Sequence, residues 1–201
     1  MYLRLPLTSL ILSTFTRRSF SQTPPSDPES QASHILQECL QARSVPYSNA
    51  TSPNWANLTT PFNLRLQYTP TVVTLPKTEE QVGNSVVCAA RAGLKVQPRG
   101  GGHSYASYSI GGKNGSVVVD MSGFDEILVD QSEFLFVPIF FMRGDEVLTF
   151  GHAESYIAKI GAGQRLGNVA LGIHEQGGRA LPHGTCAGVG IGKIFMLKLR
   201  C

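Results

Sequence analysis

The sequence predicts an α+β fold whose loops converge on one ligand. Three observations lead to this prediction. The chain has 201 residues, of which 42% are hydrophobic, so one globular domain with its own core can form. Strand-like and helix-like segments alternate in the first half and again from residue 157. Each alternation leads into a glycine-rich stretch that carries one nucleophilic side chain.

Residues 1–22 are predicted to be a targeting segment. An apolar run over residues 5–15 follows Arg4, has the length of a signal peptide and is too short to span a bilayer. Two arginines follow this run, and no acidic residue precedes Asp27, which is also typical of a mitochondrial presequence. N-glycosylation sequons begin at Asn49, Asn57 and Asn114. Because sequons are used on the secretory route, we favour secretion, with a mitochondrial location as the alternative.

Residues 23–53 are expected to form a linker and a short helix. Proline and serine are frequent over residues 23–33, which predicts a disordered joint. Apolar residues on one side then predict a helix over residues 32–42. Residues 54–69 are polar and rich in turn formers.

A β-α-β unit is predicted next. Residues 71–74 are β-branched and predict a strand. A threonine and a glutamine three residues apart can form a capping box at the start of a helix over residues 78–92, and Gly93 ends it. The chain returns as a strand at residues 94–97, and a further strand is predicted over residues 116–121.

The same pattern is expected again in the second half. Residues 157–160 predict a strand, and an apolar face from residue 166 to residue 173 predicts a helix. Gly177 and Gly178 end this helix, and residues 179–182 lead into the second glycine-rich stretch. Each nucleophile is therefore expected to follow a β-α-β excursion.

Two glycine-rich segments carry the chemistry. The first reads Arg99-Gly100-Gly101-Gly102-His103-Ser104-Tyr105. The second reads Gly184-Thr185-Cys186-Ala187-Gly188-Val189-Gly190-Ile191. Glycines let backbone N–H groups approach phosphate or carbonyl oxygens, and each segment adds one nucleophile, an imidazole or a thiol. Together the segments indicate a large cofactor held at two points.

These motifs resemble those of the FAD-linked oxidases of the PCMH-type, or vanillyl-alcohol-oxidase, superfamily, in particular the berberine-bridge-like fungal oligosaccharide oxidases. The resemblance covers residues 54–192 and implies a PCMH-type FAD-binding domain of two small α/β lobes, incomplete at its C-terminus. It implies covalent FAD, with His103 bonded to the 8α-methyl carbon and Cys186 to C6. The cofactor-binding residues implied in addition are Arg99, Gly100, Gly101, Gly102, Ser104, Tyr105, Gly184, Thr185, Gly188, Val189, Gly190 and Ile191.

The resemblance also implies a reaction. A hydride would pass from a substrate C–H bond to the flavin, and dioxygen would reoxidise the flavin, with an oligosaccharide or another small molecule as substrate. No residue matches the late tyrosine base of such oxidases, so the catalytic base is unknown and an inert, truncated flavin-binding fragment is the alternative. Similar proteins join the positions of Cys39 and Cys88 by a disulfide, with two buried thiols as the alternative.

Several of these residues have a plainer interpretation. His103 alone would be a surface imidazole in a glycine turn, and Cys186 alone would be a small buried thiol. Arg99 either adds charge beside the cofactor or pairs within the fold. Residues 161–163 either line the cofactor or form a tight turn. Asp120 and Ser122 either contact the cofactor or cap the end of a strand, and we favour the cap.

Other function classes find no support in the sequence. The net charge of +3 is small and basic residues do not cluster with aromatic ones, so neither nucleic acid nor a membrane is an expected partner. The four cysteines form no CxxC pair, which argues against a zinc site. The absence of a GxGxxG motif argues against a Rossmann enzyme. Residues 131–156 are interpreted as an insertion and residues 193–201 as an aberrant tail, and we hypothesise that both are translated introns.

Overall fold

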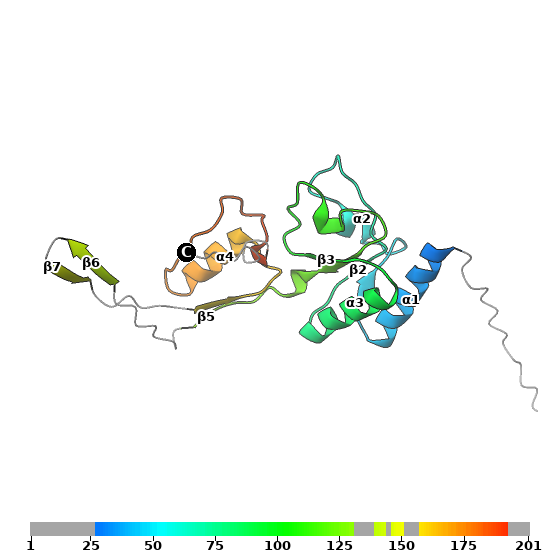
Figure 1. The fold of residues 1–201 in the computed structure, drawn as a ribbon, viewed down its shortest axis with the longest axis horizontal. Coiled ribbons are helices and arrows are strands. Elements are labelled where there is room, and N and C mark those ends of the chain that lie inside the picture. The colour runs from blue at the N-terminus through cyan, green and yellow to red at the C-terminus, as the bar shows by residue number, and fades with distance from the viewer. Residues whose placement is uncertain (1–26, 131–138, 144–145, 151–156, 193–201) are drawn as a thin grey trace, which may run out of the picture.

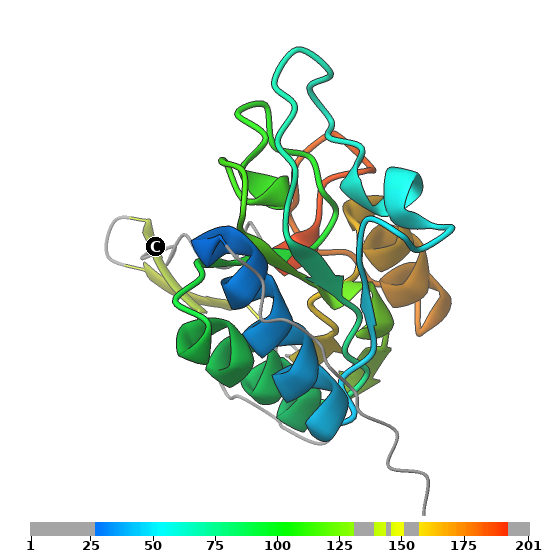
Figure 2. The ribbon, with the colours of Figure 1, turned by 90° about the vertical axis from the view of Figure 1, so that its right-hand side faces the viewer.

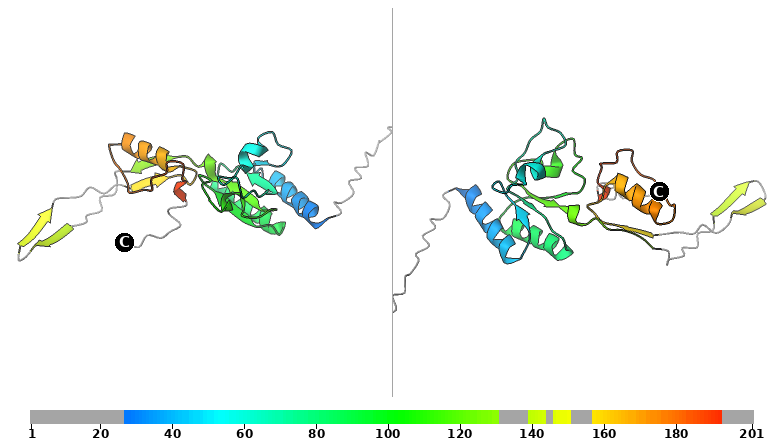
Figure 3. Two further views of the ribbon diagram at one scale, coloured as in Figure 1. Left: turned by 90° about the horizontal axis from the view of Figure 1, so that it is seen from above. Right: turned by 180° about the vertical axis from the view of Figure 1, so that it is seen from behind.

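The computed structural model describes residues 27–130, 139–143, 146–150 and 157–192 (Figure 1). The fold is α+β, as predicted, and its two lobes lie side by side along the longest axis (Figures 1 and 3). The first lobe holds α1 (Pro28–Ala42), β1 (Tyr47–Ser48), α2 (Trp55–Thr59), β2 (Val72–Thr74), α3 (Glu79–Arg91), β3 (Val96–Arg99) and β4 (Val117–Asp120). The second lobe holds β5 (Ile127–Asp130), β8 (Ile157–Ile160) and α4 (Leu166–Glu175). The short helices η1 (Tyr108–Ile110) and η2 (Met121–Gly123) lie in the loops after β3 and β4.

The predicted β-α-β unit is confirmed in the first lobe. The four-stranded sheet has the order β1-β2-β4-β3, so β4 lies between the two strands that α3 connects. β2 and β3 both run parallel to β4, with Val72 and Val96 on either side of Val117. All four residues of β4 are buried, as expected of a strand inside a parallel sheet.

Helices α1 and α3 pack side by side against the sheet (Figure 2). Leu36 and Leu40 of α1 are fully buried beside Ala89 of α3. A disulfide between Cys39 and Cys88 joins the two helices, with 5.5 Å between their Cα atoms. The disulfide implied by the resemblance is therefore present in the structure, and the alternative of two buried thiols is not.

The starts of both helices follow from local capping. The Thr78 hydroxyl accepts a hydrogen bond from the amide of Gln81 at 3.2 Å, so α3 begins where the sequence predicts. The prediction of a disordered joint over residues 23–33 is wrong for its second half, because α1 begins at Pro28. The Asp27 carboxylate accepts from the amide of Ser30 at 2.7 Å, and proline suits the first helical turn, where its missing N–H costs nothing.

The second lobe differs from the predicted repeat of the β-α-β pattern. β8 pairs antiparallel with β5, with Ile127 opposite Ile160, and α4 covers this ribbon. Over residues 157–192, no strand follows α4, so the prediction that the second nucleophile follows a β-α-β excursion is wrong. Proline at position 182 cannot donate to a ladder, and the loop instead hydrogen-bonds to the start of α4. The core of this lobe consists of Leu166, Val169, Ile173 and Ile191.

Part of the predicted insertion over residues 131–156 forms a hairpin. β6 (Ile139–Arg143) pairs antiparallel with β7 (Glu146–Phe150). Residues 134–141 are an apolar run, and its last three residues, Ile139, Phe140 and Phe141, pair with β7 in this hairpin. The other residues of the predicted insertion, the predicted targeting segment over residues 1–22 and the predicted aberrant tail over residues 193–201 lie outside the described residues. Across the described part of the chain, no helix has both the length and the apolar character needed to cross a membrane.

Candidate functional site

The two glycine-rich segments meet where the lobes face each other. A Cβ atom on Gly101 would lie 2.4 Å from the backbone nitrogen of Gly190 and 2.6 Å from the carbonyl oxygen of Gly188. Conversely, a Cβ on Gly190 would lie 2.3 Å from the nitrogen of Gly101, and one on Gly100 would lie 3.1 Å from the carbonyl oxygen of Ala162. Only glycine permits backbones to approach this closely. Gly101 and Gly190 are thus required for the two loops to touch.

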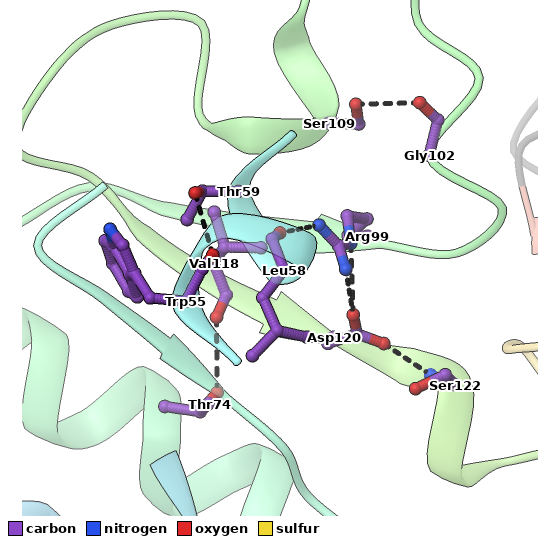
Figure 4. A network of polar contacts seen from close by, with 10 residues as sticks. All are labelled: Trp55, Leu58, Thr59, Thr74, Arg99, Gly102, Ser109, Val118, Asp120 and Ser122. Carbon is purple, nitrogen blue, oxygen red and sulfur yellow. Dashed lines mark hydrogen bonds and ion pairs between the residues drawn. The ribbon is translucent and has the colours of Figure 1, made fainter. Parts of the chain in front are cut away.

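The loop after β3 positions His103. Gly102 has φ +74°, a left-handed conformation that glycine adopts without strain. Its carbonyl accepts hydrogen bonds from the amide of Ser104 at 3.0 Å and from the hydroxyl of Ser109 at 3.1 Å (Figure 4). These bonds hold the turn that presents the imidazole.

The loop of Cys186 is bound to the start of α4. The first two amides of the helix, those of Leu166 and Gly167, donate to the carbonyls of Val189 at 2.9 Å and Ala187 at 3.0 Å. The amide of Val189 in turn donates to the carbonyl of Cys186 at 3.1 Å, closing a turn. The Cys186 thiol is exposed and free. The alternative of a buried thiol is therefore wrong for Cys186.

His103 lies against this turn. A Cβ atom on Gly188 would be 3.6 Å from Cδ2 and 4.0 Å from Nε2 of the His103 ring. One edge of the imidazole therefore faces the turn that begins at Cys186. The structure brings the two predicted motifs to one place, although they are far apart in the sequence.

His103 forms an aromatic cluster with Phe62 and Tyr105, and of these the sequence did not indicate Phe62. The ring of Phe62 stacks on the imidazole, with 3.8 Å between the ring centroids and 29° between the planes. Tyr105 meets Phe62 edge-on at 5.3 Å and is 71% exposed. Phe62 lies in the turn-rich stretch before β2, where no spacing pattern marks it, so only the tertiary contact reveals it.

Arg99 pairs within the fold. Its Nη2 lies 2.5 Å and its Nε 3.0 Å from Oδ2 of Asp120, and its Nη1 donates to the carbonyl of Leu58 (Figure 4). The Arg99 and Asp120 side chains are only 14% and 4% exposed. Asp120 also accepts from the amide of Ser122 at 2.8 Å, which confirms its predicted capping role. Of the two interpretations of Arg99, the structure therefore favours pairing within the fold.

The remaining predicted residues lie further from the imidazole. The side chain of Ile191 belongs to the core of the second lobe, and its amide donates to the carbonyl of Gln164 at 2.9 Å. The carbonyl of Gly184 lies 2.7 Å from Nδ1 of His183, and Thr185 is exposed beside it. The Gly161–Ala162–Gly163 stretch packs against the backbone of residues 121–125, which makes it a tight turn, and Gly163 also lines the hollow described next.

Two hollows flank the glycine contact. One, of about 490 Å³, is lined by residues of both motifs together with Phe62 and Arg165. The other, of about 380 Å³, lies on the side of Gln97 and Met121 and reaches Gly190. Both volumes fall in the usual range for small-molecule sites. Across the described ranges, no group of three or more metal-ligating side chains is found.

Residues 70–192 match the protein family described as FAD binding domain. The chain belongs to this family. It is 37% identical over 157 residues to the xylooligosaccharide oxidase of Thermothelomyces thermophilus, which covers 78% of this chain and 27% of that protein. The glucooligosaccharide oxidase of Sarocladium strictum is 33% identical over 162 residues, covering 81% of this chain and 28% of the relative. The chain thus spans about a quarter of the length of the curated relatives it matches.

Solved structures of the same family superpose on the fold. Xylooligosaccharide oxidase from Myceliophthora thermophila C1, in complex with xylobiose, matches with a TM-score of 0.65 at 37% identity, over 79% of this chain and 29% of that one. Glucooligosaccharide oxidase from Acremonium strictum, described with a 6-S-cysteinyl, 8α-N1-histidyl FAD, matches with a TM-score of 0.64 at 32% identity. That match covers 79% of this chain and 28% of the relative. The fold is therefore that of the FAD-binding domain of oligosaccharide oxidases.

The residues at the site fit an FAD. The backbone of Gly100, Gly101 and Gly102 lines both hollows, and glycine backbone of this kind lets a diphosphate approach its N–H groups. Beside these glycines the larger hollow opens toward the imidazole of His103 and the aromatic face of Phe62. These residues suit a flavin nucleotide, because the glycine backbone is polar, as a diphosphate requires, and the side of the hollow near Phe62 is flat and apolar, as a flavin ring requires.

Proposed function

We propose that this chain is the flavin-binding part of an FAD-dependent carbohydrate oxidase, with FAD bonded to both His103 and Cys186. One observation carries the proposal. The edge of the His103 ring faces Gly188, in the turn that begins at the free, exposed Cys186, which supports a site that uses both the imidazole and the thiol. The glucooligosaccharide oxidase with a doubly linked FAD supports the proposal by its likeness to this chain.

The chain's own residues would supply two nucleophiles and a rigid cradle. A nitrogen of His103 would hold the flavin at its 8α carbon, and the sulfur of Cys186 would hold it at C6. Each bond would replace one hydrogen on the nucleophile and one on the flavin, which leaves two electrons and two protons for dioxygen to accept as hydrogen peroxide.

The proposed substrate is a carbohydrate whose hydroxyl is oxidised. The relatives named above are oxidases of xylo- and glucooligosaccharides, which supports this class. When bound, FAD accepts a hydride from a substrate C–H bond and passes two electrons to dioxygen. At the reducing end of a sugar, this would yield a lactone and hydrogen peroxide. No residue of this chain is assigned as the base.

Covalent attachment is tested by mass spectrometry. The protein is expressed with riboflavin, precipitated in acid and digested, and the peptides that contain positions 103 and 186 are examined for added flavin. His103→Ala and Cys186→Ala should each remove one attachment, while His183→Ala, an exposed imidazole beside the second motif, should remove neither. If all the flavin of the parent protein is found in the supernatant after acid precipitation, the proposal is contradicted.

A flavin-binding chain without turnover is the second candidate. It stays beside the first candidate because no described residue is assigned as the base. Peroxide formation with a panel of xylo-, gluco- and chitooligosaccharides separates the two candidates. Covalent flavin with no peroxide from any sugar would support the inert chain.

We further propose a secreted location. The Cys39–Cys88 disulfide supports it, because disulfides persist in oxidising compartments. Two of the three sequon asparagines, Asn57 and Asn114, are exposed. Expression in a eukaryotic host should yield protein in the medium whose mass falls on treatment with an N-glycosidase. Retention in mitochondria without glycan would refute the proposal.

A further inference from the structure

We infer that Phe62 is a positioning residue that fixes the plane of the His103 imidazole for attachment to the flavin. The inference rests on the proposed function, and it deepens it by naming a residue outside both motifs. The rings of Phe62 and His103 lie nearly parallel, with 3.8 Å between their centroids. This distance corresponds to direct contact of the two faces.

Nothing else in the described part of the chain restrains this imidazole as directly. Three glycines precede His103, so the preceding part of its loop offers no side chain to hold the ring. Among the described residues, none hydrogen-bonds to a ring nitrogen of His103. Tyr105 meets the ring only edge-on, with 6.1 Å between the centroids. Stacking on Phe62 is therefore the contact that orients the ring.

The stretch that carries Phe62 is itself bound to the His103 loop. The side-chain amide of Asn63 donates to the carbonyl of Tyr105 at 2.8 Å, and the hydroxyl of Ser107 lies 3.5 Å from the carbonyl of Asn63. On the other side, the carbonyl of Leu58 accepts from the guanidinium of Arg99. Phe62 is thus held in place relative to the loop that it orients.

Orientation matters because the nucleophilic lone pair of imidazole lies in the plane of its ring. A ring nitrogen can attack a carbon only when the carbon lies in the plane of the ring. If the ring rotates freely, most of its orientations toward the flavin are therefore unreactive. A flat partner against one face limits the rotation. The stabilisation from one aromatic pair is enough to raise the population of the stacked ring orientation, relative to the other orientations, by about threefold to tenfold.

The test measures the orientation of the His103 ring and the rate of flavin attachment in the parent and in four variants of the full chain. Phe62→Leu keeps apolar volume but removes the flat face, Phe62→Ala removes both, and Phe62→Tyr keeps the face. Leu64→Ala is the matched control, because Leu64 lies in the same stretch and is 65% exposed. Ring-proton chemical shifts of His103 are measured by NMR before FAD is added. The rate of flavin attachment at the peptides of His103 and Cys186 is then followed by mass spectrometry.

We expect Phe62→Leu and Phe62→Ala to move the His103 ring signals and to slow attachment at His103 by about threefold to tenfold. Attachment at Cys186, and both readouts in Phe62→Tyr and Leu64→Ala, should stay as in the parent. An unchanged rate at His103 in Phe62→Leu, with flavin present on the parent, overturns this inference alone. A parent without flavin on His103, whose ring signals still respond to Phe62→Leu, overturns the proposed function and with it the attachment role.

Discussion

Replacing Gly101 by alanine should separate the two glycine loops. The new Cβ would lie 2.4 Å from the nitrogen of Gly190, whereas ordinary van der Waals contact begins at 3.4 Å. The obstacle is backbone, which cannot rotate away, so the loops must part by about 1 Å or the chain must distort. Overpacking of this kind costs about 1–3 kcal/mol of folding free energy. Because a displacement of about 1 Å can slow a positioned reaction about 100-fold, flavin attachment should suffer more than stability.

Two measurements check this prediction. The melting temperature should fall by about 2–4 °C for each kcal/mol lost, and covalent flavin per mole of protein should drop sharply. Gly83→Ala is the control, since Gly83 is exposed within α3 and no atom lies within 4 Å of the added Cβ. It should raise stability by about 0.4–1 kcal/mol and leave flavin content unchanged. A Gly101→Ala protein with the parent's melting temperature and flavin content would refute the close contact.

Three further predictions concern stability and are read from urea unfolding. Asp120→Ala leaves the guanidinium of Arg99 without its carboxylate in a largely buried site, so it should cost about 3–5 kcal/mol; a loss under about 1 kcal/mol would contradict this pairing. Removing the disulfide by Cys39→Ala with Cys88→Ala frees a loop closed over 49 residues and should cost about 4 kcal/mol. Dithiothreitol should lower the stability of the parent, and an equal effect on the double variant would exclude the disulfide as its cause. Thr78→Ala removes the side-chain cap of α3 and should cost about 1 kcal/mol, whereas no change would mean that solvent caps the helix equally well.

Local signals predicted the first lobe well. The cap at Thr78, the glycine at position 93 and the β-branched strands around α3 depend on neighbours within a few residues, so the β-α-β unit could be predicted from the sequence. The start of α1 was misplaced although its signal was equally local. Asp27 followed by Pro28 is a helix start, but the surrounding prolines and serines favoured a disordered interpretation.

The candidate site was predicted only in its nucleophiles and glycines. The pairing of Arg99 with Asp120 joins neighbouring parallel strands, so it depends on the register of the sheet. The stacking of Phe62 on His103 joins a turn-rich stretch to a loop beyond the next helix and two strands, and no periodicity encodes it. The antiparallel pairing of β5 with β8 likewise depends on segments separated by the insertion.

By itself, the sequence determined which residues can do chemistry and where the backbone can come close. An imidazole, a thiol and runs of glycine are properties of the residues, and they stay the same however the chain folds. Tertiary structure alone decided that Gly101 touches Gly190, that His103 faces Gly188 and that Phe62 covers the imidazole. These contacts arise because two lobes with separate cores meet along bare backbone, and the position of one core relative to another is set by packing between segments distant in the chain.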